Sequence, residues 1–223
     1  MKKILLVSLV MLIVVSVAFS QFGIKGGINL GTVGGDDKSI STSMGKLDPK
    51  TNVGFVGGIS YRIGLIMGLS IQPEVLYAQK GAIYEASASV GNYFMNDKAT
   101  FTNNYIDIPI LAKYNLPIPL LSPYIEGGVE YGLLLSAKEK EEMTTNAPGQ
   151  TSGSTETDTK DQFAKSDFSI VIGIGVEFLM LDVNARYVIG LAKLGKDDPT
   201  MLVNPGDLKA YNRGFQLTAG LRF

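Results

Sequence analysis

The stretch GFQLTAGLRF, residues 214–223, alternates between two kinds of side chain. Every second residue is apolar, and the residues between are polar or glycine. A period of two residues is typical of a β-strand with one apolar face. The alternation continues to the final phenylalanine, so the predicted strand keeps its apolar face throughout: Phe215, Leu217, Ala219, Leu221 and Phe223.

Seven earlier segments repeat this alternation. Each has about 10 residues or more, the length of a tilted strand that crosses a membrane, whereas strands of soluble proteins average nearer 5 or 6. The segments are residues 21–31, 51–62, 67–80, 105–114, 123–137, 167–178 and 181–191.

The two faces of these segments differ in an unusual way. One face is large and apolar, and the other combines glycine with charged side chains, the reverse of a soluble sandwich. This inversion is typical of a barrel with lipid outside and a narrow polar lumen inside. The predicted lumen charges balance, six against six: Lys25, Arg62, Lys80, Lys113, Arg186 and Arg222 with Glu74, Asp107, Glu126, Glu130, Glu177 and Asp182.

The connections between segments also alternate. Those at residues 63–66, 115–122 and 179–180 are short, and the other four are long. Short periplasmic turns and long extracellular loops are typical of outer-membrane barrels. We therefore predict an all-β fold: an eight-stranded antiparallel up-and-down transmembrane β-barrel, which satisfies every backbone group within the sheet.

Aromatic residues on the predicted outward face gather at the strand ends. Two such girdles are expected where a barrel meets the two membrane interfaces. The short-turn girdle would comprise Phe22, Tyr61, Tyr114, Phe178 and Phe223, and the long-loop girdle Phe55, Tyr77, Tyr131, Phe168, Tyr187 and Phe215.

Residues 1–20 have the pattern of a secretory signal peptide. Two lysines precede an apolar run from Ile4 to Phe19, and Ala18 and Ser20 supply small residues before Gln21. The run is short for a spanning helix, so we expect cleavage rather than an anchor. The mature domain would cover residues 21–223, with 18 basic and 21 acidic residues and a net charge of −3.

The composition excludes several functions. The chain has no cysteine and no histidine, so disulfides, thiolate metal sites and the usual histidine general base are ruled out. The charge balance gives no reason to expect nucleic acid. We expect no cofactor, no metal site and no catalytic residues.

Three stretches resemble a known family. FGIKGGINLG at 22–31, YIDIPILAKY at 105–114 and GFQLTAGLRF at 214–223 are similar to the PorT-like family of outer-membrane β-barrel proteins. The resemblance spans the mature chain, through alternation patterns rather than catalytic motifs. It implies a barrel in the outer membrane of a Bacteroidota-type bacterium. Some members are linked to secretion or surface assembly, but no motif here specifies that role.

The lumen charges are interpreted first as a structural network, because buried charge is tolerable only when paired. Glu126 and Glu130 resemble a catalytic carboxylate pair, yet four residues along a strand separate them by roughly 13 Å, beyond the roughly 5–9.5 Å that glycosidases need. Glu177, on another segment, remains a candidate partner for either Glu126 or Glu130 in such a carboxylate pair. The acidic pairs Asp36-Asp37 and Asp197-Asp198 are read as solvated loop charge rather than calcium ligands.

The expected partners follow from this location. They are outer-membrane lipid and lipopolysaccharide, the barrel-assembly machinery, which would recognise the C-terminal strand, and an unknown protein at the extracellular loops. Residues 138–165 are predicted to be a mobile loop of this kind. Two alternatives remain open: an outer-membrane enzyme acting at the barrel rim, and a soluble secreted barrel that carries a small ligand.

Overall fold

The computed structural model describes residues 21–35, 40–42, 45–118, 120–148, 150–195 and 210–223. The predicted signal peptide, Asp36-Asp37 and Asp197-Asp198 lie outside these ranges. Among the described residues, no helix is long and apolar enough to cross a membrane.

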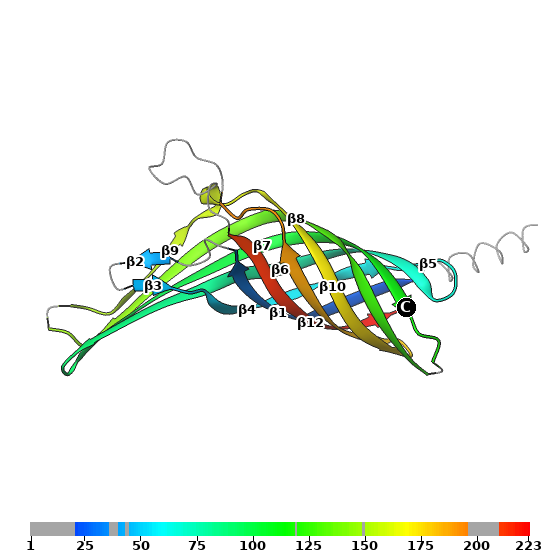
Figure 1. Cartoon of the computed structure of the whole chain (residues 1–223), viewed down its shortest axis with the longest axis horizontal. Coiled ribbons are helices and arrows are strands. Elements are labelled where there is room, and N and C mark those ends of the chain that lie inside the picture. The colour runs from blue at the N-terminus through cyan, green and yellow to red at the C-terminus, as the bar shows by residue number, and fades with distance from the viewer. Residues whose placement is uncertain (1–20, 36–39, 43–44, 119, 149, 196–209) are drawn as a thin grey trace, which may run out of the picture.

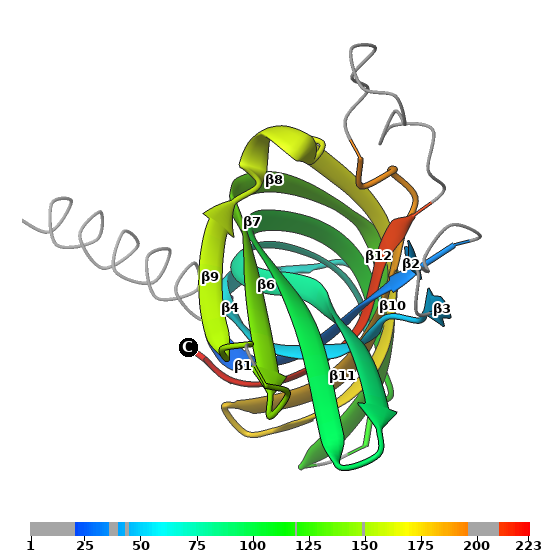
Figure 2. The ribbon, with the colours of Figure 1, turned by 90° about the vertical axis from the view of Figure 1, so that its left-hand side faces the viewer.

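Eight long strands form one closed antiparallel ring (Figures 1 and 2). Each pairs with its neighbour in the chain order, β8 pairs with β10, and β12 returns to pair with β1. The strands are β1 (Phe22–Gly34), β4 (Lys50–Tyr61), β6 (Leu69–Val90), β7 (Tyr93–Asn115), β8 (Leu121–Thr145), β10 (Ser166–Phe178), β11 (Leu181–Gly190) and β12 (Tyr211–Arg222). The predicted barrel is therefore confirmed.

Short elements complete the described chain. β5 (Ile63–Gly64) extends the β4 side of the sheet at a periplasmic turn, and β9 (Gly153–Asp158) pairs with β8 alone. β2 (Ile40–Thr42) and β3 (Gly45–Leu47) form a separate hairpin, and η1 (Lys160–Gln162) is a single 3₁₀ turn.

The terminal stretch 214–223 closes the ring. Leu217 lies opposite Ile28 on β1 and opposite Ala185 on β11, so β12 is paired along both edges. The amide of Phe223 donates a hydrogen bond of 2.8 Å to the carbonyl oxygen of Phe22. Pairing between the first and last strands leaves the membrane-spanning sheet with no free edge, as a lipid environment requires.

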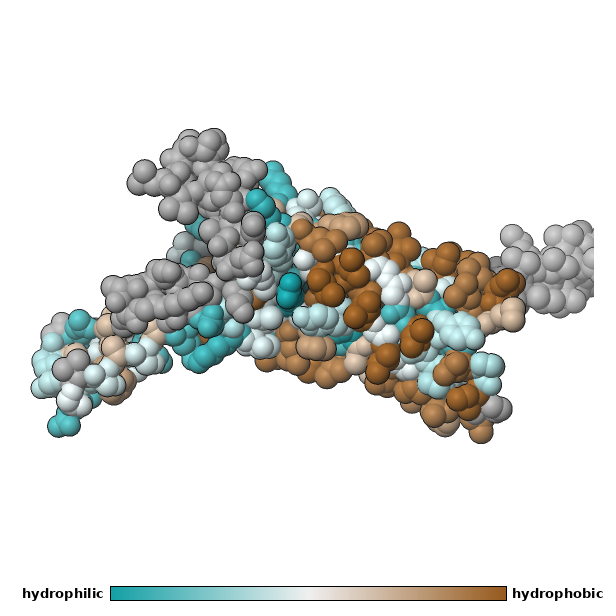
Figure 3. Space-filling view, in the orientation of Figure 1, coloured by the Kyte–Doolittle hydropathy of each residue, from teal (hydrophilic) through white to brown (hydrophobic). Residues whose placement is uncertain are grey.

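The outward face of the barrel is apolar. In Figure 3 hydrophobic side chains cover the part of the barrel near the short turns. The predicted aromatic girdles both face outward, and on the long-loop side they form pairs on adjacent strands. Phe55 stacks on Tyr77 at 5.1 Å and Tyr187 lies 4.6 Å from Phe215, while Phe168 is the register partner of Tyr131.

The predicted long loops at 81–104 and 138–165 are wrong. β6 and β7 run on as a hairpin whose turn comprises only residues 91 and 92, and β8 continues to Thr145 before β9 pairs with it. We call this four-stranded projection the blade: residues 82–90 of β6, 93–104 of β7, 136–145 of β8, and β9. It extends to the left of the barrel in Figure 1.

The apolar face changes sides where the barrel becomes the blade. On β6 the outward Val75 and Tyr77 give way to Glu85, while the inward Glu74 and Lys80 give way to Tyr84, which is only 8% exposed. β7 changes in the same way. A strand prediction that requires an apolar outward face therefore ends at this boundary. Beyond it, the apolar side chains of the same strands face inward.

Backbone irregularities mark this transition. Gly81 has a φ of +149°, and a β-carbon there would lie 2.0 Å from the carbonyl oxygen of Phe101, so only glycine fits without strain. On β8 the pairing with β7 skips Leu135, a bulge that shifts the alternation by one residue.

Candidate functional site

The barrel interior holds the predicted charges in ion pairs that cross the lumen. The middle cluster is centred on Arg186 of β11, whose side chain is 1% exposed. Its guanidinium donates to both carboxylate oxygens of Glu74 on β6, at 2.6 and 2.8 Å, and to those of Glu126 on β8, at 2.5 and 3.2 Å. Lys25 of β1 also donates to Glu74, at 2.7 Å. This cluster has two cations and two anions.

A lower cluster lies toward the short turns. Glu177 of β10 accepts hydrogen bonds from Arg62, at 2.9 Å and through a second, shorter contact, and from Arg222 at 2.7 Å. Lys113 lies 2.9 Å from Glu177 and 2.8 Å from Asp182. Three cations therefore face two carboxylates at the periplasmic end.

An upper cluster surrounds Lys80 of β6. Its ammonium lies 3.0 Å from Asp107, 3.0 Å from Glu130 and 3.7 Å from Asp167. Asp167 was missed by the sequence prediction, although it shares the alternation of the inward Ser169. The same carboxylate oxygen of Asp167 accepts a hydrogen bond of 2.8 Å from Asn212. One cation thus faces three carboxylates, so the described lumen charges are seven anions and six cations.

Two inward tyrosines were also missed. The ring centroid of Tyr124 lies 3.5 Å from the ammonium of Lys113, and the hydroxyl of Tyr124 donates a hydrogen bond of 2.8 Å to Asp182. Tyr105 lies 4.9 Å from the ammonium of Lys80. Both are positioned for cation–π contacts with a buried lysine. The alternation could have identified them, but tyrosine was read as an outward girdle residue.

Glycine on the inward face leaves space for these side chains. A β-carbon at Gly173 would lie 3.0 Å from Cγ of Arg186 and 3.0 Å from a carboxylate oxygen of Glu126. A larger residue at this position would displace the central ion pair. Gly173 and Gly175 in the fragment Gly173-Ile174-Gly175 therefore have a packing role in β10, as expected of glycines within a strand.

The arrangement is a packed interior. Arg186, Tyr105, Lys113 and Gln216 are among the largest fully buried side chains, and eight strands enclose a space just wide enough for side chains. Glu126 and Glu130 belong to different clusters, each paired with its own cation. Within the described residues, no group of three or more acidic side chains is arranged to hold a metal ion.

The interior also contradicts the soluble ligand-carrying alternative. That alternative needs apolar side chains inside and polar ones outside. Here Asp107, Lys113 and Arg186 are buried, while Ile125 and Ile174 are 62% and 64% exposed on the barrel exterior.

The blade carries ion pairs of a different kind on its outer face. Lys50, the first residue of β4 beside the base of the blade, pairs with Glu85 of β6, and Lys140 pairs with Glu142 at 2.7 Å, all in exposed or half-exposed positions. A hydrogen bond from Lys50 lowers the pKa of Glu85, and one from Lys140 lowers the pKa of Glu142. Lys138 likewise lowers the pKa of Glu156 on β9. On the inner face, burial raises the pKa of Glu139.

The far end of the blade presents an aromatic pair on a fixed backbone. Tyr93 and Phe94 are 50% and 44% exposed. Asn146, which follows β8, accepts a 2.6 Å hydrogen bond from the amide of Phe94 and donates one of 3.0 Å to the carbonyl of Asn92. We call this group of four residues the apex. No charged residue occurs in 86–96 or 143–155.

Three solved structures cover most of the chain with low sequence identity. Ail of Yersinia pestis, in complex with the heparin analogue sucrose octasulfate, is 17% identical with a TM-score of 0.37, covering 91% of this chain and 98% of its own. Neisserial surface protein A is 12% identical with a TM-score of 0.38, covering 91% and 97%. The outer membrane enzyme PagL is 10% identical with a TM-score of 0.41, covering 90% and 99%.

Sequence comparison gives a family. A search of curated proteins finds no significant match. The profile of the outer membrane protein beta-barrel domain, however, matches residues 18–195, most of the chain. That range contains seven of the eight barrel strands and every charged lumen residue named above except Arg222. The chain therefore belongs to the family of the outer membrane protein beta-barrel domain, and its location is the bacterial outer membrane.

Proposed function

We propose that this protein is a surface-recognition protein, in which the barrel is a rigid anchor and the blade binds a partner outside the cell. The observation that carries the proposal is the continuity of β6, β7 and β8 from the barrel into the blade. A continuous sheet holds the apex at a fixed distance and orientation from the membrane. A flexible loop would lose conformational entropy on binding, and this sheet avoids much of that cost.

The apex has the chemistry of a recognition surface. Tyr and Phe offer large contact areas with few rotatable bonds, and serine, glycine and asparagine around them supply adaptable hydrogen bonds. The hydrogen bonds of Asn146 fix the backbone beneath Tyr93 and Phe94. Because the surrounding segments carry no charge, we infer that the partner surface is close to neutral.

Photocrosslinking in living cells tests this proposal. A photoreactive amino acid replaces Tyr93 at the apex or, as the control, Thr100 lower on the outer face of β7. We expect a crosslinked product from position 93 that disappears when Phe94→Ser is added, and none from position 100. Products of equal yield from both positions, or from neither, would contradict recognition at the apex.

We also propose that the barrel neither conducts ions nor catalyses a reaction. The packed lumen supports the first part, and the absence of histidine from the sequence supports the second. Purified protein inserted in a planar bilayer should show no stepwise conductance. Regular unitary steps would refute the closed lumen.

Export and assembly are proposed from the two ends of the chain. We infer that residues 1–20 are removed during export, that the barrel contacts lipopolysaccharide in the outer leaflet, and that the assembly machinery recognises the outward residues of β12. Strand addition to the β12 edge would suit this step, because β1 covers that edge only after closure. Deleting Phe223 should reduce assembly in cells more than refolding in detergent. Equal losses would leave only an anchoring role.

Within the family, we propose a relation to the PorT-like members of Bacteroidota-type bacteria. Its support is the resemblance of residues 22–31, 105–114 and 214–223. We assign no role in secretion.

A further inference from the structure

The two faces of the blade differ in charge. On the outer face, acidic and basic side chains alternate across the strands, with Glu85 opposite Lys98 and Lys98 opposite Glu142. All three lysines in the described residues of the blade lie on this face, and each is within 4.0 Å of a carboxylate: Lys98, Lys138 and Lys140. The outer face is therefore neutralised by its own side chains.

The inner face carries acidic side chains and, within the described residues of the blade, no basic one. We call Asp97, Glu139 and Glu141 the acidic row. Glu139 lies opposite Phe101, whose ring packs against the buried Tyr84, and the other two follow the same alternation. Among the described residues, none of the three forms an ion pair. Burial and the nearby charge of Glu141 raise the pKa of Glu139, as expected where carboxylates lie close together without a cation.

Two buried oxygen atoms at the barrel end of the acidic row have no hydrogen-bond partner within the described parts of the chain. They are Oδ1 of Asn103 and Oγ1 of Thr159, and both residues are 2% exposed. Asn103 lies opposite Ala137, whose carbonyl accepts a hydrogen bond of 3.0 Å from the amide of Thr159. The two oxygens therefore lie on the inner face, one row closer to the barrel than Glu139, where an N–H donor of a ligand would satisfy them.

The excess of negative charge continues into the barrel. The inner face of the blade continues the inner wall of the barrel (Figure 2). Lys80, which lies opposite Asn103, faces the three carboxylates of the upper cluster. A recessed surface lined by charges of one sign concentrates its potential and attracts ligands of the opposite sign. The ligand expected on this face is therefore a cation.

The spacing of the acidic row requires more than one positive charge in that ligand. Glu139 and Glu141 are two residues apart on β8, or about 6.8 Å, and Asp97 lies diagonally from Glu141 at about 7–8 Å. The whole row is about 14 Å long. Carboxylates at this spacing do not share one metal ion, and no group of three acidic residues in the described chain is arranged to do so. Alternate side chains of an extended peptide repeat at the same interval of about 6.8 Å.

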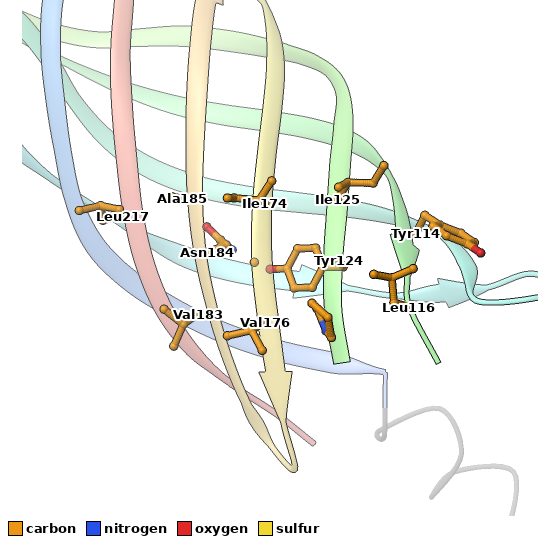
Figure 4. A pocket seen from close by; sticks show the side chains of 12 residues that line it. Tyr114, Leu116, Tyr124, Ile125, Ile174, Val176, Val183, Asn184, Ala185 and Leu217 are labelled. Carbon is orange, nitrogen blue, oxygen red and sulfur yellow. The ribbon is translucent and has the colours of Figure 1, made fainter. Parts of the chain in front are cut away.

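We propose that the inner face of the blade binds an extended cationic peptide segment with lysine or arginine at alternate positions. The cationic groups pair with the acidic row, and their aliphatic stems pack on Met143, which is 36% exposed and lies opposite Asp97. This inference extends the proposed function, since it rests on a blade outside the cell and adds a second contact below the apex. The lipid-facing wall lacks this chemistry, because the depression of about 740 Å³ in Figure 4 has no charged residue in its lining.

Fluorescence anisotropy of a labelled peptide tests the proposal. Residues 21–223, refolded in a nonionic detergent, are titrated against the peptide KTKTKTK, with the rearranged peptide KKTTTKK and spermine for comparison. Two variants each lose three negative charges. The inner variant carries Asp97→Asn, Glu139→Gln and Glu141→Gln. The outer variant, its matched control, carries Glu85→Gln, Glu142→Gln and Glu156→Gln. Heat-modifiable migration on gels verifies folding.

We expect the inner variant to bind KTKTKTK about tenfold more weakly than the unmodified protein, and the outer variant to stay within about twofold. KKTTTKK should bind about threefold more weakly than KTKTKTK, because its cations do not alternate. Equal losses in the two variants would overturn the proposal, since net charge alone would then explain binding. Spermine that binds as tightly as KTKTKTK would also overturn it, in favour of a small polyamine.

Crosslinking from position 93 separates this inference from recognition at the apex. Failure of the unmodified protein to bind KTKTKTK, while the position-93 product still forms in cells, would overturn the inference about the acidic row alone. Peptide binding without a position-93 product would instead contradict recognition at the apex and support the acidic row as a separate site.

Discussion

The strands β6, β7 and β8 form two regions, the barrel and the blade, in which the apolar side chains lie on opposite faces. In the barrel their outward side chains are apolar and their inward side chains are charged, as with Val75 beside Glu74. In the blade part of β6 the charged side chain faces outward and the apolar one inward, as with Glu85 beside Tyr84. The solvent outside each region explains the change, because an apolar exterior is stable in lipid and a polar exterior is stable in water.

The ion pairs of the two regions differ for the same reason. Arg186 and Glu74 are almost completely shielded from solvent, whereas Lys138 and Glu156 are about half exposed. Removing one partner of a buried pair leaves an unpaired buried charge, while removing an exposed one leaves a hydrated charge. The chemistry of the pair is similar, and burial sets its energetic weight.

The largest expected effect tests the buried side of this comparison. Arg186→Leu leaves Glu74 and Glu126 without their shared guanidinium, so the free energy of unfolding in lipid should fall by about 3–5 kcal/mol, while membrane insertion persists. Lys138→Leu in the blade is the control and should change it by about 1 kcal/mol or less. An unfolding free energy unchanged by Arg186→Leu would refute the network's stabilising role.

The boundary between lipid and water can be located by placing lysine on the outward face of β7. Ile110→Lys lies in the apolar belt and should cost about 2–4 kcal/mol, whereas Thr100→Lys in the blade should stay within about 0.5 kcal/mol. Denaturant titration of both variants in lipid measures the difference. Equal costs at the two positions would mean that the change of apolar face between Ile106 and Asn104 does not mark the membrane boundary.

The blade's inner face should behave as a small apolar core. Phe101 packs edge-on against Tyr84 at 5.9 Å. Phe101→Ala should destabilise the blade by about 1–2 kcal/mol, because the ring is half-buried, and hydrogen exchange of blade amides should accelerate while barrel amides stay protected. Thr100→Ala, on the opposite face, is the control. Faster exchange in both regions would show that they unfold as one unit.

Acidification should give the smallest effect, limited to the blade's exposed pairs. The pKa of Glu85 is lowered from its ordinary 4.5 by the hydrogen bond from Lys50. A lowered folded-state pKa means that the pair stabilises the fold above pH 4.5 and that this contribution is lost as pH falls through the lowered value. Proteolysis of the blade should therefore accelerate slightly in strong acid.

Lys50→Met is the matched control for this pH dependence. It removes the hydrogen bond that lowers the pKa of Glu85, so its proteolysis rate should change less on acidification. An equal change in proteolysis rate in the unmodified protein and in Lys50→Met would mean that the Lys50–Glu85 pair does not cause the pH dependence. Glu139 works in the opposite direction, since burial raises its pKa and protonation favours the fold.

Sequence alone located the eight strands and twelve of the lumen charges, because the period of two directly records which face meets lipid. It did not identify Asp167, which begins its segment and was left out of the alternation, or the inward Tyr105 and Tyr124. Nor did it predict the blade, because a search for an outward apolar face ends where that face turns inward.

The alternation in GFQLTAGLRF by itself determined a strand and its two faces, and the seven similar segments placed that strand in an outer-membrane barrel. Only the tertiary structure decided which charges meet, because Arg186 on β11 and Glu74 on β6 are 112 residues apart and on strands that are not neighbours. Closure of the ring brings them together. Local pattern specifies the face of a side chain, while its partner depends on closure and register.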